Sequence, residues 1–173
     1  SLTNFDTERL RIIVEEGGVP IVSNQVSYSL VDTRPGEAMA AYAATKGVKL
    51  LCYGTVLGGL LSDKYLGVPE PRGRGQLNTA SLGKYKQFVD AWGGWALLQE
   101  LLVACRAIAD KHSVAGAPPL TIANVAVRWV IQQPAVGGAI VGLLGVAGNK
   151  LPTFSGPELV KQLECGSEKA MTM

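Results

Sequence analysis

The stretch VKLLCYGTVLGGLLSDKY, residues 48–65, says most about the fold and the ligand of this chain. Its apolar run from Val48 to Cys52 predicts a buried strand, which delivers one aromatic residue, Tyr53, into a loop of small residues. Because glycine has no Cβ, the glycines of this loop let a ligand come close to the main chain. An aromatic ring beside open backbone amides suits a flat ring joined to phosphates. The alternative is a buried strand followed by an ordinary glycine turn.

Helix and strand patterns alternate on both sides of this stretch. Asp6 is a plausible N-cap for a helix over 7–15, and an Ala-rich helix is expected over 37–46. The remaining expected elements are a strand over 21–26, a long loop over 66–81, helices over 85–92, 95–111 and 121–132, and a short strand over 138–142. Alternating helices and buried strands favour an α/β fold with a parallel sheet and right-handed crossovers.

Polar or aromatic residues stand where three of the expected strands end. They are Thr3 and Asn4, if a strand precedes them, then Asn24 and Gln25, and finally Tyr53. Ligands of parallel α/β sheets bind at the carboxyl ends of the strands. Either amide at 24 or 25 could simply satisfy backbone groups in a core, but the repetition at three strand ends favours one shared binding mouth.

Composition and charge narrow the function classes. The chain has 173 residues, 47% of them hydrophobic and 17% charged, which suits one domain with a real core. The formal net charge of +2 is weak, and Arg72 and Arg74 stand in a Pro/Gly loop without interleaved aromatics, so no nucleic-acid partner is expected. No apolar stretch reaches membrane-spanning length, and we expect a soluble, intracellular and cytoplasmic protein with no membrane partner.

The cysteines and the histidine do not form a metal or disulfide pattern. Cys52, Cys105 and Cys165 are widely spaced and form no C-x-x-C motif, so neither a zinc site nor a disulfide framework is expected. His112 is the only histidine, which argues against a His-rich metal cluster and a Ser–His triad. Its expected place is near the C-terminus of a helix.

Several segments, taken in order, resemble the second half of the (β/α)8 barrel of the aldo/keto reductase family. The segments are SLTNF (1–5), VSNQVSYSL (22–30), GVKLLCYGTVLGGLLSDKY (47–65), TIANVAVRWVIQQPAV (121–136) and GAIVG (138–142). The resemblance implies a partial (β/α)8 TIM barrel over residues 1–142, the C-terminal half of an aldo/keto reductase domain. Residues 143–173 follow as a divergent tail.

The resemblance implies an NADPH-dependent carbonyl reductase, which transfers a hydride to a small-molecule aldehyde or ketone. By position, Thr3, Asn4 and Gln25 would hold the nicotinamide carboxamide. Tyr53 would stack on the nicotinamide ring, and Lys64 would add charge near the phosphates. The backbone that would line the pyrophosphate belongs to Gly54, Thr55, Val56, Leu57 and Gly59.

Two departures from the family pattern bear on activity. The family's catalytic tyrosine and its lysine, aspartate and histidine partners belong to the first half of the barrel. Tyr28, Tyr42 and His112 do not stand in those motifs, so we assign no catalytic residue and expect the chain alone to be inactive. Leu144 stands where the family has an arginine for the adenosine 2′-phosphate, which leaves the NADPH/NADH preference open.

Three functional alternatives follow. The chain is the cofactor-side half of a reductase, a non-catalytic nucleotide-binding or regulatory module, or an inactive truncated isoform.

A half-barrel would expose apolar strand edges and inner faces, so we expect marginal stability or self-association. Trp92 and Trp95 could line a substrate pocket, although helical spacing favours core packing.

Overall fold

A computed structural model describes residues 1–71, 77 and 79–142 of the chain. All of them belong to one unit, Ser1–Gly142, and Leu143–Met173 form a second unit. The expected tail with Leu144, the loop arginines Arg72 and Arg74, and Cys165 lie outside the described residues.

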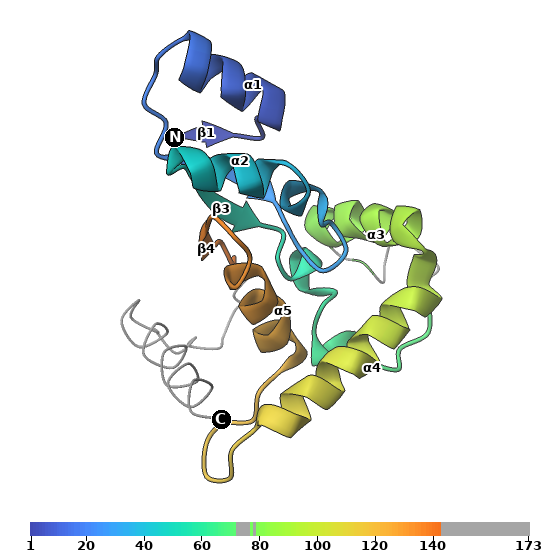
Figure 1. Ribbon diagram of the computed structural model, residues 1–173. Coiled ribbons are helices and arrows are strands. Elements are labelled where there is room, and N and C mark those ends of the chain that lie inside the picture. The colour runs from blue at the N-terminus through green and yellow to red at the C-terminus, as the bar shows by residue number, and fades with distance from the viewer. Residues whose placement is uncertain (72–76, 78, 143–173) are drawn as a thin grey trace. The chain divides into compact units, whose positions relative to one another are not determined.

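The described unit is built on one four-stranded parallel sheet (Figure 1). Its strands are β1 (Leu2–Thr3), β2 (Ser23–Ser27), β3 (Lys49–Tyr53) and β4 (Val136–Ala139), and they pair in chain order. Because all strands run the same way, their carboxyl ends lie along one edge. The predicted α/β class and parallel sheet are confirmed.

Helices connect the strands. They are α1 (Thr7–Arg11), which continues into a π-helical turn (Ile12–Glu16), α2 (Met39–Lys46), α3 (Ala80–Trp92), α4 (Gly94–His112) and α5 (Ile122–Ile131). Short 3₁₀ turns cover Arg34–Gly36, Leu57–Gly59 and Asp63–Tyr65. The Asp6 carboxylate caps α1 by accepting a 2.8 Å hydrogen bond from the Arg9 N–H, as predicted.

Several element boundaries differ from the sequence expectation, most clearly the starts of α3 and β4. Helix α3 begins at Ala80 rather than at residue 85, because the Thr79 hydroxyl accepts from the Leu82 N–H at 3.1 Å and caps it five residues earlier. Strand β4 begins at Val136 rather than at 138, because Val136 is already paired with Leu50 of β3.

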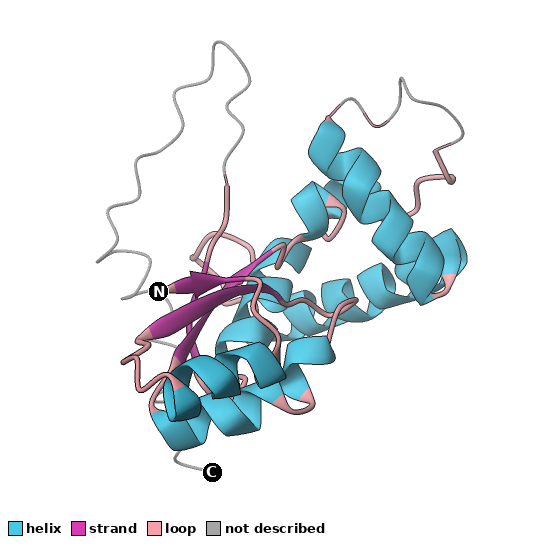
Figure 2. Cartoon of the chain, turned by 90° about the horizontal axis from the view of Figure 1, so that it is seen from above, coloured by secondary structure: helices cyan, strands magenta, loops and turns pink. Residues whose placement is uncertain are grey.

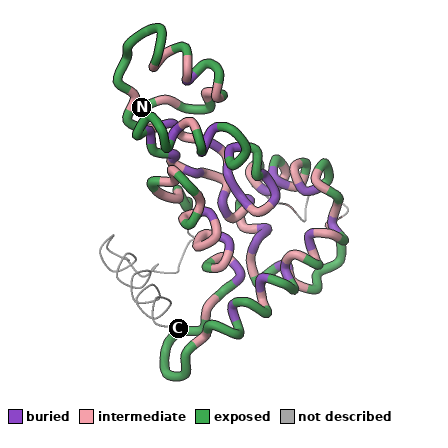
Figure 3. Tube along the Cα trace, viewed as in Figure 1, coloured by how far each residue is buried: buried purple, intermediate pink, exposed green. Residues whose placement is uncertain are grey.

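The two faces of the sheet differ in character. Asn24, Val26, Leu50 and Cys52 are buried on the face covered by α1, α2 and α5. The opposite face, which would line a barrel, is partly open (Figures 2 and 3). Its residues in β2 and β3 are Ser23, Gln25, Ser27, Lys49, Leu51 and Tyr53. In β2 and β3 this face is therefore mostly polar, with Leu51 and Tyr53 as its apolar residues, because strand alternation puts Val26, Leu50 and Cys52 under the helices.

A second apolar cluster packs α3, α4 and α5 around the loop that follows β3. Trp95 is buried there, donates from Nε1 to the Val68 carbonyl at 2.8 Å and lies edge-to-face with Tyr65. The packing role favoured for Trp95 is confirmed. His112 is the last residue of α4, as expected. In the part of the chain that the structure describes, no helix is both long and apolar enough to cross a membrane.

Candidate functional site

Two side chains from non-neighbouring strands meet at the carboxyl edge of the sheet. The Tyr53 hydroxyl, at the end of β3, donates a 2.7 Å hydrogen bond to Asn4 Oδ1, just after β1. Strand β2 lies between them, so this bond spans the end of that strand. Asn4 has a left-handed φ of 59° and its N–H donates to the Gln25 carbonyl at 2.8 Å, which turns its side chain towards Tyr53.

A hollow of about 380 Å³ opens beside this hydrogen bond. Asn4 and Tyr53 line it together with Ser27, Arg34 and Met39, among others. The volume lies within the range of roughly 300–1,000 Å³ that is usual for small-molecule sites. The ring of Tyr53 and the amide of Asn4 are both half-open or exposed, so a planar ligand carrying an amide can reach them.

Thr3, Asn24 and Gln25 do not reach this hollow. Asn24 is fully buried on the helix side, where its Nδ2 donates to the Phe5 carbonyl at 2.9 Å, so its expected place at the mouth is wrong. Gln25 shares the open face with Tyr53 but lies in mid-strand, paired with Thr3 on one side and Leu51 on the other. Its expected place at a strand end is also wrong, because β2 continues to Ser27.

Part of the glycine loop is covered by α3. A Cβ on Gly54 would lie 2.7 Å from the Tyr85 hydroxyl oxygen, and one on Gly58 would lie 3.0 Å from Ser81 Oγ. Both glycines therefore serve close packing as well as their left-handed conformations. Gly59 has a φ of 105°, and no atom lies within 4 Å of the place that a Cβ would take there.

The backbone amides of the loop divide into two groups. The N–H groups of Leu57 and Gly59 donate at 2.9 Å to the carbonyls of Gly54 and Val56. Within the described residues, the N–H groups of Thr55 and Val56 have no hydrogen-bond partner. The Thr55 hydroxyl is buried and also lacks a partner among those residues.

Two cations that sequence reasoning missed flank Tyr53. Lys84 Nζ, from α3, lies 5.8 Å from the centroid of the Tyr53 ring, within cation–π distance. Arg34, from the loop after β2, lines the same hollow as Tyr53. Neither stands in a recognisable motif, and only tertiary structure brings them to this edge. Lys64, the cation proposed from sequence, instead lies 5.4 Å from the ring centroid of Tyr65.

Arg34 is held by a buried carboxylate. Its Nε and Nη2 donate to the two Asp32 carboxylate oxygens at 2.7 and 2.8 Å. The side chain of Asp32 is 3% exposed and that of Arg34 is 75% exposed. Burial alone would raise the pKa of Asp32, but hydrogen bonds from Arg34 and Ser27 outweigh it and lower that pKa. The hydrogen bonds to Asp32 and its negative charge raise the pKa of Arg34.

The two described cysteines do not line this hollow. Burial raises the pKa of Cys52 to about 12 and also raises that of Cys105. No group of three or more His, Cys, Asp or Glu side chains that could hold a metal ion occurs in residues 1–71, 77 and 79–142.

Comparison with known proteins identifies relatives of the chain. It is 40% identical over 132 residues to flagellar radial spoke protein 5 of Chlamydomonas reinhardtii, covering 76% of this chain and 24% of that protein. It is 23% identical over 145 residues to an aldo-keto reductase of Babesia bovis, covering 81% of this chain and 47% of that one. The chain thus spans less than half the length of either relative.

The fold also has a counterpart of known structure. A glycerol dehydrogenase from Gluconobacter oxydans superposes with a TM-score of 0.57 at 20% identity, covering 79% of this chain and 37% of that one. At this identity the likeness concerns the fold. The profile of the aldo/keto reductase family matches residues 1–146, and the chain therefore belongs to the aldo/keto reductase family.

Proposed function

We propose that this chain is the cofactor-side half of an NADPH-dependent carbonyl reductase. The observation that carries the proposal is the Tyr53–Asn4 hydrogen bond at the carboxyl edge of the sheet, beside a hollow of small-molecule size. Family membership supports oxidoreductase chemistry in the parent protein.

The residues at this edge fit the nicotinamide end of a dinucleotide. Tyr53 offers a ring for stacking and Asn4 an amide for the carboxamide. Gln25 and Thr3 do not line the hollow, and a role for them requires a ligand that extends over the open face. Lys84 lies over the Tyr53 ring, so a stacked ligand would displace it or use the other side of the ring.

The phosphates would lie on the loop after β3. The N–H groups of Thr55 and Val56, which have no partner in the described part of the chain, and the open backbone at Gly59 are its best-suited parts, because such amides attract anions. When bound, NADPH supplies a hydride that, with one proton, converts a carbonyl to an alcohol and leaves NADP⁺. No side chain of this chain is assigned as the proton donor, and we propose that the chain alone is inactive.

Titration of the 173-residue chain with NADPH, followed by nicotinamide fluorescence, tests this function. We expect binding, with a Kd raised about fivefold by Tyr53→Ala, because stacking contributes about 1 kcal/mol. Tyr42→Ala, which removes a half-buried tyrosine on α2, is the matched control and should leave the Kd unchanged.

The outcomes separate the alternatives. Binding without turnover of an aldehyde supports the proposal and is also expected of a nucleotide-binding regulatory module. An assay of the chain together with the remainder of the barrel separates the two, because only the reductase half then gives turnover. Absence of NADPH binding to the folded chain would favour an inactive truncated isoform. Turnover of an aldehyde by the chain alone would contradict the proposed inactivity.

A further inference from the structure

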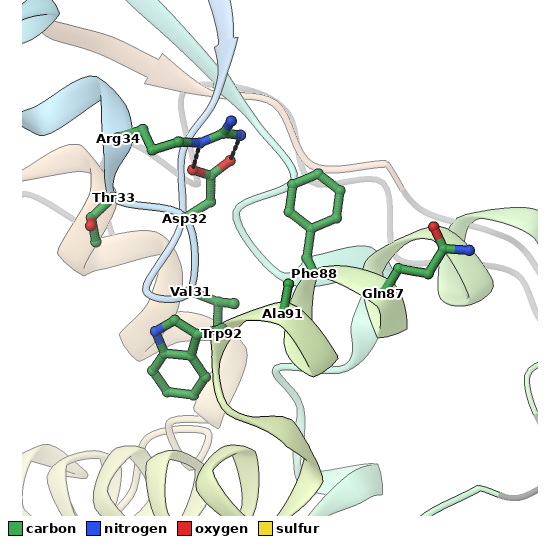
Figure 4. A pocket seen from close by; sticks show the side chains of 8 residues that line it. All are labelled: Val31, Asp32, Thr33, Arg34, Gln87, Phe88, Ala91 and Trp92. Atoms are coloured by element: carbon green, nitrogen blue, oxygen red, sulfur yellow. Dashed lines mark hydrogen bonds and ion pairs between the residues drawn. The ribbon is translucent and has the colours of Figure 1, made fainter.

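A second hollow lies next to the first and shares Arg34 with it. It has a volume of about 480 Å³ and lies between the loop after β2 and helix α3. Figure 4 shows the Arg34–Asp32 pair across from Phe88 and Ala91 of α3, with Trp92 drawn beside Val31. Its apolar lining includes Val31, Phe88 and Trp92. Trp92, unlike Trp95, thus has a pocket-lining position.

Arg34 is suited to bind an anion from this place. A guanidinium group has five N–H donors, and Asp32 occupies two of them, on Nε and Nη2. The remaining donors have no acceptor among the described residues. Because Asp32 is buried and Arg34 is exposed, a ligand meets the guanidinium rather than the carboxylate. The bidentate pair also fixes the orientation of the fork, which lowers the entropy cost of binding.

The apolar wall and the cation together define one class of ligand. Phe88 and Trp92 offer aromatic surface for an apolar body, and Arg34 offers paired donors for a carboxylate. Since Arg34 also lines the hollow of Tyr53, a carbonyl next to that carboxylate would lie on the Tyr53 side.

We propose that the hollow of Arg34, Phe88 and Trp92 binds 2-oxo acids with an aromatic or bulky apolar side chain, with Arg34 pairing with the carboxylate. The assignment of the carbonyl as the reacting group rests on the proposed reductase function. The binding of the carboxylate and the apolar body does not depend on it.

The test is binding of benzoylformate compared with its neutral methyl ester. We would follow the Trp92 indole N–H signal by NMR in the 173-residue chain, assigned with Trp92→Phe. Benzoylformate should bind about tenfold more tightly than the ester, since hydrogen bonds between charged groups are worth more than neutral ones. Equal affinities for acid and ester would overturn the proposal.

Variants locate the effect. Arg34→Gln should abolish the preference for the acid and leave ester binding unchanged. Arg9→Ala is the matched control, because Arg9 also forms an exposed pair with an aspartate, Asp6, but does not line this hollow. Where Arg34→Gln fails to fold because Asp32 is left buried and unpaired, the double variant Asp32→Asn/Arg34→Gln removes both charges together. Retention of the acid preference in that variant would refute the role of Arg34.

Measuring benzoylformate binding in the presence of saturating NADPH shows whether Arg34 binds a substrate carboxylate or a cofactor phosphate. If benzoylformate still binds with NADPH present, the anion at Arg34 belongs to the substrate, as proposed. Competition between the two would assign Arg34 to a phosphate and overturn the proposal. Binding of benzoylformate by a chain that does not bind NADPH would support this site and contradict the proposed reductase function. Binding of NADPH by a chain that does not bind benzoylformate would support the reductase function and contradict this site.

Discussion

The hydroxyl of Tyr53 donates to Oδ1 of Asn4 across the end of the strand that separates them. The bond joins two segments 49 residues apart in the sequence and fixes both side chains at one edge. A ligand that uses the Asn4 amide therefore meets a group already oriented, whose Nδ2 donates to no acceptor within residues 1–71, 77 and 79–142.

Asn4 allows conformation and ligand contact to be tested separately. Asn4→Ala should be less stable than Asn4→Gly by about 1 kcal/mol, because Ala meets the steric cost of the left-handed conformation and Gly does not. Both variants lack the amide and should raise the Kd for NADPH equally. Urea unfolding and NADPH fluorescence measure the two effects, and unequal Kd values would argue against contact through the amide.

Thr55→Val should stabilise the fold by about 1 kcal/mol, because it replaces a buried hydroxyl that has no partner among the described residues by a methyl group of the same shape. NADPH binding should be unchanged, since only the backbone of Thr55 is proposed to contact phosphate. Thr45→Val is the control: its hydroxyl donates to the Tyr42 carbonyl at 2.7 Å, so no gain is expected. A loss of stability in Thr55→Val, measured by urea unfolding, would indicate a partner for the hydroxyl in solution.

The Asp32–Arg34 pair should make stability depend on pH. The pKa of Asp32 is lower in the folded chain than its unfolded value near about 4, so its contribution is fully present above that value and is lost as pH falls through the folded pKa. The urea concentration at which half of the unsubstituted chain is unfolded should therefore fall more steeply between about pH 5 and 3 than the same midpoint of Asp32→Asn.

Arg34→Gln supplies the opposite case. Without the guanidinium, burial is the main remaining influence and raises the pKa of Asp32, which makes the charged form costly at pH 7. This variant should be less stable at pH 7 than the Asp32→Asn/Arg34→Gln double variant. Equal urea midpoints for the single and the double variant at pH 7 would show that burying the Asp32 carboxylate without Arg34 has no cost in stability.

Local patterns predicted most of the fold and part of the site. The cap at Asp6, the strand that ends at Tyr53 and the parallel sheet all follow from residue type and spacing. Asn24 faces the helices and Gln25 faces the open side, and which of the two is buried depends on the register of β2. A strand with polar residues on both faces does not specify that register by its sequence pattern. Arg34 and Lys84 reach Tyr53 only through tertiary packing, and no local motif marks them.

Burial of the thiols leads to a last prediction. With Cys165 replaced by Ser, the native chain should take up almost no iodoacetamide at pH 8, because a pKa of about 12 leaves roughly one Cys52 in ten thousand as thiolate and burial blocks access to it. Cys105 is buried in the second apolar cluster, and its raised pKa should protect it likewise. Unfolding in urea should expose both thiols to labelling, as counted by mass spectrometry. Rapid labelling of Cys52 without denaturant would mean that the helix-covered face of the sheet opens in solution, since Cys52 is buried there in one cluster with residues of α2 and α5.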